Sequence, residues 1–162
     1  MKKINLMIAI SAISTLLMAG GDITPVQEKE NSIKPCYENE ATYVQEEKGL
    51  MWQDMKYTDR EHGAYKRGKI AGKVGKANYA KNYCRNLNYA GYSDWRLPTS
   101  EELMSVYTYS ERPFINWVED NFWSSTPASN GKNYAIYATD GNRYEKKTTT
   151  SEYIRCVRCL ND

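Results

Sequence analysis

The feature that most constrains this chain is its set of four cysteines, all of which follow an N-terminal segment typical of exported proteins. The cysteines are Cys36, Cys84, Cys156 and Cys159. An even number of thiols in an oxidising compartment predicts two disulfides, for which three connectivities exist. Residues 153–158 are typical of a β-strand, in which three residues span about 10 Å, whereas a disulfide tolerates about 7 Å between Cα atoms. A bond between Cys156 and Cys159 is therefore excluded, and both remaining connectivities join the C-terminal strand to Cys36 and Cys84.

The C-x-x-C spacing of Cys156 and Cys159 also occurs in redox-active pairs and in zinc sites. A redox pair of that kind needs its first cysteine at the start of a helix, and the few residues after Cys159 supply no helix. The four cysteines are not spaced as two zinc-binding knuckles either. We therefore predict structural disulfides, no metal site and no cofactor.

Residues 1–20 have the layout of a signal peptide. A basic start at residues 1–3 precedes an apolar run over residues 4–17, and small residues follow. A membrane anchor is the alternative, but the run is short for a bilayer core of about 30 Å. Gly21 stands where a lipoprotein would carry its acylated cysteine. We therefore expect cleavage, no lipid anchor, and a protein located in the periplasm, at the cell surface or outside the cell.

The rest of the chain has the composition of one globular domain. Apolar residues make up 41% of the sequence, charged residues make up 26%, and the formal net charge is +2. These values argue against disorder and against binding to nucleic acid through bulk charge. No later stretch is apolar for long enough to span a membrane. Residues 21–40 are predicted to form a polar arm, and residues 41–162 are predicted to form the domain.

Periodicity and turn residues predict an α+β domain. One helix is expected from residue 77, with an apolar stripe that includes Cys84, and a second begins at Thr99, where Thr99 and Glu102 form a capping box. Residues 55–76 are predicted to form a long loop. Strands are expected at residues 42–44, 50–53, 121–125, 134–137, 142–144 and 153–158, with hairpin turns at Asn130-Gly131 and Asp140-Gly141.

Basic residues are concentrated between positions 56 and 85, where nine lysines and arginines stand against two acidic residues. Charge-assisted hydrogen bonds from such a segment favour an anionic ligand. The candidate residues are Lys66, Arg67, Lys69, Lys73 and Lys76. The alternative is that this segment only balances the acidic residues at positions 22–47.

No arrangement in the sequence favours catalysis. His62 is the only histidine and lies in a charged segment, so we expect a solvated side chain. The hydroxyls at residues 124–126 lack the G-x-S-x-G surroundings of a hydrolase nucleophile, and no phosphate-binding glycine loop occurs. We therefore predict that the protein is not an enzyme.

Five short motifs follow one another along residues 41–159. They are Gly49-Leu50-Met51-Trp52-Gln53, Ala80-x-x-x-Cys84-x-x-Leu87 with Gly91-Tyr92, Asp94-Trp95-Arg96-Leu97-Pro98-Thr99-x-x-Glu102-Leu103, Trp123-Ser124-Ser125-Thr126 and Arg155-Cys156-Val157-Arg158. In this order they resemble the Lcl C-terminal domain family, which is named after a Legionella collagen-like protein. The collagen-like repeat itself is absent.

The resemblance implies a C-type-lectin-like fold, with two helices packed on antiparallel sheets and long loops. In that fold a helical cysteine bonds a cysteine on the last strand, which implies Cys84–Cys156 and leaves Cys36–Cys159. It also implies framework roles, such as core packing and the ordering of loops, for Trp52, Asp94, Trp95, Arg96, Pro98, Thr99, Glu102 and Trp123. The Glu-Pro-Asn, Gln-Pro-Asp and Trp-Asn-Asp motifs of calcium-dependent lectins do not occur.

These observations predict an exported, non-catalytic, lectin-like binding or adhesion module for an anionic polysaccharide or a cell-envelope protein. The founding member of the family is linked with glycosaminoglycan binding and surface attachment. A structural or assembly component of an envelope complex, docked through the arm or an exposed strand, is the alternative. A relative of the formylglycine-generating oxidases, which use a reactive cysteine pair, is a third hypothesis.

Overall fold

The computed structural model of the protein describes residues 41–108, 110 and 112–160. The expected signal peptide, the polar arm and Cys36 lie outside the described residues. In chain order the elements are β1 (Thr42–Gln45), the 3-10 helix η1 (Glu46–Lys48), β2 (Leu50–Gln53), α1 (Asp59–Lys66), β3 (Val74–Gly75), α2 (Ala77–Arg85), α3 (Ser100–Val106), β4 (Asn121–Pro127), the 3-10 helix η2 (Ser129–Gly131), β5 (Lys132–Tyr137), β6 (Arg143–Lys147), β7 (Glu152–Tyr153) and β8 (Val157–Cys159). The predicted α+β class is confirmed.

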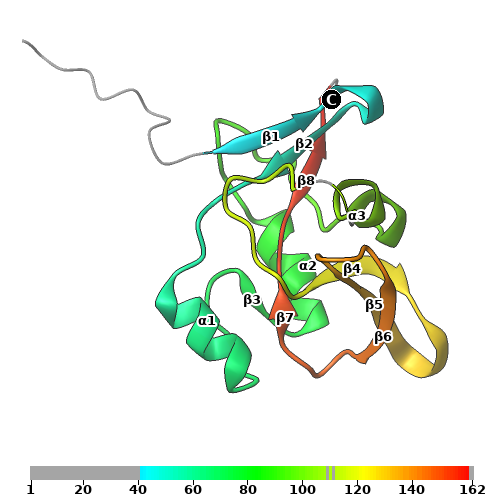
Figure 1. Ribbon diagram of the computed structural model, residues 1–162. Coiled ribbons are helices and arrows are strands. Elements are labelled where there is room, and N and C mark those ends of the chain that lie inside the picture. The colour runs from blue at the N-terminus through cyan, green and yellow to red at the C-terminus, as the bar shows by residue number, and fades with distance from the viewer. Residues whose placement is uncertain (1–40, 109, 111, 161–162) are drawn as a thin grey trace, which may run out of the picture. The chain divides into compact units, whose positions relative to one another are not determined.

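The strands form two sheets. The smaller sheet has the order β1-β2-β8 and is antiparallel. The larger has the order β3-β7-β4-β5-β6, and its β4–β7 pair, joined through Phe122 and Tyr153, is parallel. Figure 1 shows the C-terminal segment running from β7 in the larger sheet to β8 in the smaller one. The single strand predicted at residues 153–158 is therefore wrong, because residues 154–156 leave one sheet to reach the other.

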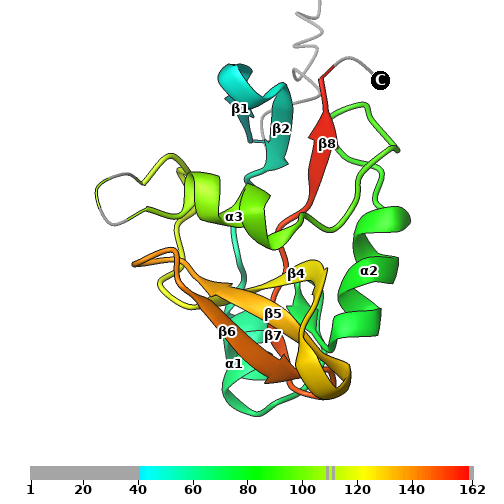
Figure 2. The same ribbon diagram turned by 90° about the vertical axis from the view of Figure 1, so that its right-hand side faces the viewer.

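The two predicted helices are present, and a capping box marks the start of α3, whereas α2 has no side-chain cap. At the start of α3 the Thr99 hydroxyl accepts the amide of Glu102 at 3.1 Å, and the Glu102 carboxylate accepts the amide of Thr99 at 2.8 Å. This exchange satisfies two amides that a helix start leaves unpaired. The buried face of α2 consists of Ala77, Ala80 and Cys84. Figure 2 shows α3 above the hairpin strands and α2 beside β4.

The long loop predicted at residues 55–76 is wrong, because α1 and β3 lie within it. A second capping box starts α1, in which the Thr58 hydroxyl accepts the amide of Glu61 at 3.3 Å and Glu61 accepts the amide of Thr58 at 2.7 Å. The buried residues of α1 are Glu61 and Ala64. The helix therefore has no apolar stripe from which its periodicity could be recognised.

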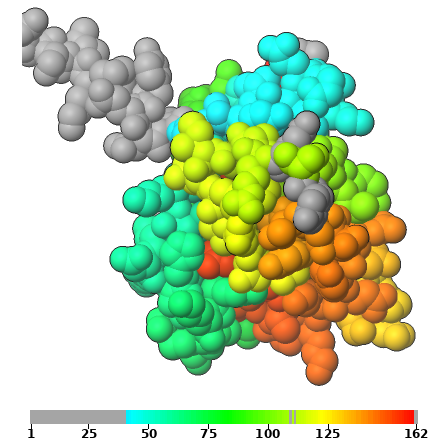
Figure 3. All heavy atoms as spheres, viewed as in Figure 1, coloured from blue at the N-terminus to red at the C-terminus, as the bar shows by residue number. Residues whose placement is uncertain are grey.

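The larger core cluster is built from aromatic rings around a buried arginine. Arg155 is 1% exposed, and its guanidinium carbon lies 3.7 Å from the ring centroid of Phe114. Its Nη1 donates to Asp54 at 3.0 Å and its Nη2 donates to the carbonyl of Asn116 at 2.7 Å. These bonds fix the segment 112–120, which crosses the surface between α1 and β6 in Figure 3. The buried charge is thereby both paired and hydrogen-bonded, as burial requires.

The second core cluster surrounds a disulfide between Cys84 and Cys156, whose Cα atoms are 5.5 Å apart. The predicted pairing is confirmed, and both cysteines are fully buried. The bridge joins α2 to the segment between β7 and β8 across a sequence separation of 72 residues. In the chain-entropy model a loop of that length corresponds to about 4 kcal/mol of stabilisation. Among the described helices none has the length and apolar character needed to cross a bilayer.

Candidate functional site

The five basic residues proposed from the sequence do not form one site. Lys66 and Arg67 are exposed where α1 ends, and Lys69 is exposed in the turn that follows. Lys76 is exposed at the start of α2, whereas Lys73 is 4% exposed. None of the five lines the cavity described below.

Lys73 is wrong as a ligand-binding candidate. Its ammonium lies 2.9 Å and 3.1 Å from the two carboxylate oxygens of Glu61 and 5.0 Å from the ring centroid of Tyr57. Gly72 permits this approach, because a Cβ there would lie 2.2 Å from Glu61 Oε1. Burial raises the pKa of Glu61. Hydrogen bonds from the amides of Lys73 and Thr58 and from the Lys73 ammonium lower it by more, so the pKa falls below its ordinary value. The pair is a buried structural contact, and no solvent-borne ligand reaches this lysine.

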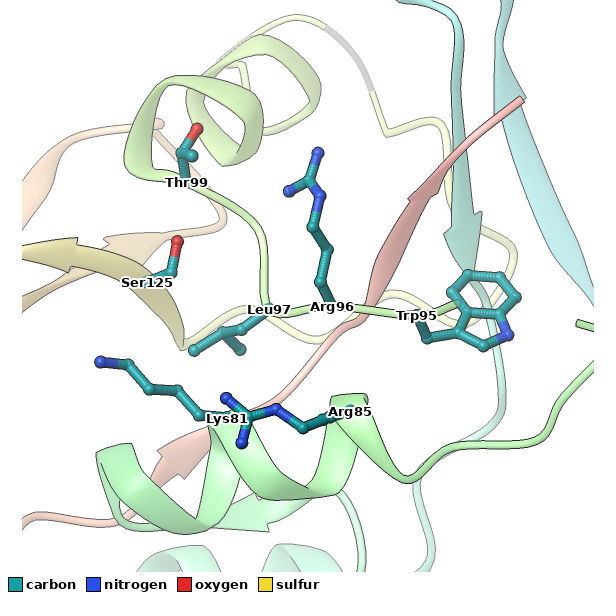
Figure 4. Close-up of a pocket in the computed structure, with 7 residues that line it drawn as sticks. All are labelled: Lys81, Arg85, Trp95, Arg96, Leu97, Thr99 and Ser125. Atoms are coloured by element: carbon teal, nitrogen blue, oxygen red, sulfur yellow. The ribbon is translucent and has the colours of Figure 1, made fainter. Parts of the chain in front are cut away.

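A cavity of about 490 Å³ opens between α2 and the segment that leads into α3 (Figure 4). It is lined by Lys81, Arg85, Trp95, Arg96, Leu97, Thr99 and Ser125. Three of these side chains carry a positive charge and none carries a negative one. The cavity therefore favours an anion over a neutral or cationic ligand.

Lys81 and Arg85 reach the cavity from one face of α2, because residues four apart are neighbours on a helix. Figure 4 shows both side chains between the helix and Leu97. On the buried side of the helix, the bridge at Cys84 holds α2 in place. Within the described ranges neither Lys81 nor Arg85 takes part in an ion pair. No carboxylate of the described residues therefore neutralises these two charges.

Arg96 differs from these two cations because it already has a partner. Its Nη1 and Nη2 donate to the two carboxylate oxygens of Glu102 at 2.7 Å and 2.6 Å. Burial raises the pKa of Glu102, but the hydrogen bond from Arg96 and the amide of Thr99 outweigh it, and the pKa falls below its ordinary value. The pairing of Arg96 with Glu102 therefore joins the cavity wall to the cap of α3.

The remaining lining residues give the cavity its shape. Trp95 is 2% exposed and its Nε1 donates to the carbonyls of Tyr89 and Tyr92, both at 3.1 Å. Figure 4 shows its ring pointing away from Lys81. Leu97 is buried, and Ser125 reaches the cavity from β4. Trp95 thus packs the core behind the cavity and presents no stacking surface to a ligand.

The other residues implied as framework lie in the core or in ordered turns. Trp52 and Trp123 are fully buried, and the indole N–H of Trp123 donates to the carbonyl of Gly75 at 2.7 Å. Asp94 accepts two bonds from Arg158 Nε at 2.9 Å and 3.0 Å, which lower the pKa of its carboxyl. The carbonyl of Pro98, also buried, accepts the amide of Ser125 at 2.7 Å.

Of the side chains considered for catalysis, Ser125 lines this cavity, whereas His62 and Ser124 do not. His62 is half-buried rather than solvated, and its Nδ1 lies 2.7 Å from the hydroxyl of Tyr153, which corrects the prediction of a solvated ring. The Ser124 hydroxyl donates to the carbonyl of Tyr134 at 2.8 Å. In the part of the chain that the structure describes, no group of three or more His, Cys, Asp or Glu side chains is placed to hold a metal ion.

Cys159 is half-buried at the end of β8 and forms no disulfide with any described residue. Its proposed partner, Cys36, lies outside the described residues. The second disulfide therefore stays a prediction.

Lys81 and Arg85 are the residues that the sequence-based site missed. Both lie inside the basic segment that was recognised, but they were not assigned to it as ligand contacts. The available signal was a pair of basic residues four apart on the polar side of a predicted amphipathic helix.

Two comparisons with known proteins bear on this chain. A family model described as the Lcl C-terminal domain matches residues 41–158, which is well over half of the chain. The comparison with curated proteins finds no match.

Proposed function

Because this chain belongs to the Lcl C-terminal domain family, we propose that its domain is an exported, non-catalytic module that binds an anionic glycan. The ligand sits in the cavity between α2 and α3, where Lys81 and Arg85 contact its carboxylate or sulfate groups. The protein acts in the periplasm, at the cell surface or outside the cell, in binding or adhesion at the envelope.

The observation that carries this proposal is the pair of unpartnered cations in a concave site. Lys81 and Arg85 line a cavity of about 490 Å³ and form no ion pair with a described residue. A charged oxygen that enters would gain charge-assisted hydrogen bonds without first displacing a carboxylate. The charge of Arg96 is balanced by Glu102, so Lys81 and Arg85 carry the proposed contact.

The cysteine chemistry supports a binding role over an oxidase role. Cys84 and Cys156 are bridged and fully buried, so neither offers a thiolate to a substrate. His62 is bonded to Tyr153 and lies on α1, on a different element from the cations of the cavity.

A heparin column with a rising salt gradient tests the proposal. A variant that loses contacts between its basic side chains and the sulfate groups of heparin should show a lower affinity and a weaker dependence of that affinity on salt. The test variant is Lys81→Ala/Arg85→Ala. The control variant is Lys66→Ala/Arg67→Ala, which removes one lysine and one arginine from the exposed end of α1. We expect the test variant to bind at least about tenfold more weakly and the control to stay close to wild type.

Three other results of the heparin experiment would contradict the proposal. Equal weakening of the two double variants would show a diffuse charge effect and overturn the assignment to the cavity. Greater weakening of the control would place the site at the end of α1. No retention of the wild-type protein at low salt would reject an anionic ligand.

A further inference from the structure

The larger sheet carries a second hollow, separate from the cavity that is proposed to bind an anion (the anionic site). Its volume is about 260 Å³, and it is lined by Asn121, Tyr137, Tyr144 and Lys146. These residues come from β4, β5 and β6, the last three strands of the sheet, and Figure 2 shows β6 at the outer edge. No basic residue of the first cavity lines it.

Strand register explains why these side chains share one face. Asn121 pairs with Tyr137, and Tyr144 pairs with Ala135, two residues before Tyr137 on the same strand. Paired residues, and residues two apart on a strand, point to the same side of a sheet. Ile136, between these positions, points to the opposite side and is fully buried in the aromatic core. On the other face Ala135 is buried in the second core cluster, and the hollow lies beside it at Tyr137 and Tyr144.

Two tyrosine rings form a corner in this hollow. The ring centroids of Tyr137 and Tyr144 are 6.5 Å apart, and the ring planes are inclined by 87°. Tyr144 is 44% exposed, although an aromatic ring of this size usually gains from burial. Among the described residues neither hydroxyl has a hydrogen-bond partner. The corner offers a flat apolar surface together with polar groups at its rim.

Charges of both signs lie around the hollow. The ammonium of Lys146 lies 3.7 Å from Glu152 Oε1, and Glu152 is 4% exposed. Asp120, next to Asn121, accepts hydrogen bonds from the Asn121 amide groups and from the Tyr65 hydroxyl. An anion would meet these carboxylates and a cation would meet Lys146, so an uncharged ligand is favoured over both.

We propose that this hollow is a second ligand site, which binds one uncharged pyranose ring. The C–H face of such a ring packs on a tyrosine, as apolar surface does on an aromatic side chain. Its hydroxyls exchange hydrogen bonds with the amide of Asn121, the ammonium of Lys146 and the tyrosine hydroxyls, which include both donors and acceptors. The volume of about 260 Å³ accommodates one ring and not a long chain segment. The proposal does not depend on the anionic site.

Saturation-transfer NMR on the full chain tests this site with four uncharged probes: the methyl glycosides of glucose, galactose, mannose and N-acetylglucosamine. We expect transfer to the ring C–H protons of at least one probe. Tyr144→Ala should weaken binding roughly fivefold, whereas Tyr144→Phe, which keeps the ring, should bind within about twofold of wild type. The matched control is Tyr134→Ala, which removes a tyrosine from the opposite face of the same hairpin.

Two results would overturn the proposal. The first is no transfer from the wild-type protein to any of the four glycosides. The second is an equal loss in Tyr144→Ala and Tyr134→Ala, which would trace the effect to the hairpin as a whole. Retention of Tyr144→Ala on heparin separates this site from the anionic one, because that variant keeps Lys81 and Arg85.

Discussion

The first and third helices begin with the same local device and are held in different ways. At α1 the box is Thr58 with Glu61, and at α3 it is Thr99 with Glu102. In both, the threonine hydroxyl and the glutamate carboxylate exchange hydrogen bonds with each other's backbone amides. Each glutamate also meets a cation.

The difference lies in where the cation comes from and how much water reaches it. Glu61 binds Lys73, which follows α1 in the chain, and the two side chains are 6% and 5% exposed. Glu102 binds Arg96, which precedes α3, and the two side chains are 19% and 41% exposed. The first contact fixes the fold around a buried charge, while the second shapes the wall of the proposed anionic site. One motif thus holds a buried ion pair at α1 and a half-exposed one beside the cavity at α3.

The largest expected effect is at the buried pair. Glu61→Gln leaves the Lys73 ammonium buried without a counter-charge, so the free energy of unfolding should fall by about 3–5 kcal/mol. Urea denaturation measures this change. Adding Lys73→Met removes the stranded charge and should recover most of the loss. A loss below about 1 kcal/mol in the single variant would mean that water reaches this lysine.

The two capping threonines should contribute equally to the free energy of unfolding. Thr58→Ala and Thr99→Ala each remove one side-chain acceptor from a helix start, which costs about 1 kcal/mol in either case. Chemical denaturation of both variants under one set of conditions tests the equality. If Thr58→Ala had no effect, the start of α1 would depend on its ion pair and not on its cap.

At the half-exposed pair, charge matters more for binding than for stability. Glu102→Gln keeps a capping acceptor and should change the free energy of unfolding by less than about 1 kcal/mol, because solvent screens the pair. The same change leaves Arg96 without its counter-charge at the cavity. The variant should therefore elute from heparin at higher salt than wild type. Earlier elution would contradict the location of the anionic site.

Acid should lower the free energy of unfolding through the glutamates of both capping boxes. The pKa of each glutamate lies below its ordinary value of 4.5, so each contributes stability above that pH and loses it as pH falls through the lowered folded-state pKa. The free energy of unfolding should begin to fall as the pH drops below about 5. The Glu61→Gln/Lys73→Met variant should show a shallower fall. An equal fall in that variant would assign the acid sensitivity to other groups.

The contrast between the helices also explains what could be predicted from the sequence. The box at Thr99 is followed by buried Leu103 and Val106, so capping and periodicity agreed and the helix was found. The box at Thr58 is followed by a polar segment, and its helix is held by Lys73 from outside. A contact between residues twelve positions apart leaves no periodic trace, so Lys73 was counted among the candidate contacts for an anionic ligand.

The candidate site shows the same limit. The α2 face with Lys81 and Arg85 was within reach of helical periodicity. The cavity also needs Leu97, whose neighbour Arg96 pairs with the backbone of Val157, and Ser125, which lies on β4. Contacts between segments so far apart in the chain arise from packing, and the local sequence pattern does not predict them. Basic residues at Lys66 and Lys76 look the same in sequence and line no part of this cavity.

The order of strands in the smaller sheet governs how the protein is made. The β1–β2 hairpin is synthesised early, but the other edge of β2 pairs with β8, and Cys84 waits for Cys156. A nascent chain on the ribosome therefore carries an open strand edge and an unbridged thiol until nearly the whole domain has emerged. The smaller sheet and the bridge are therefore completed only when the C-terminal segment is in place.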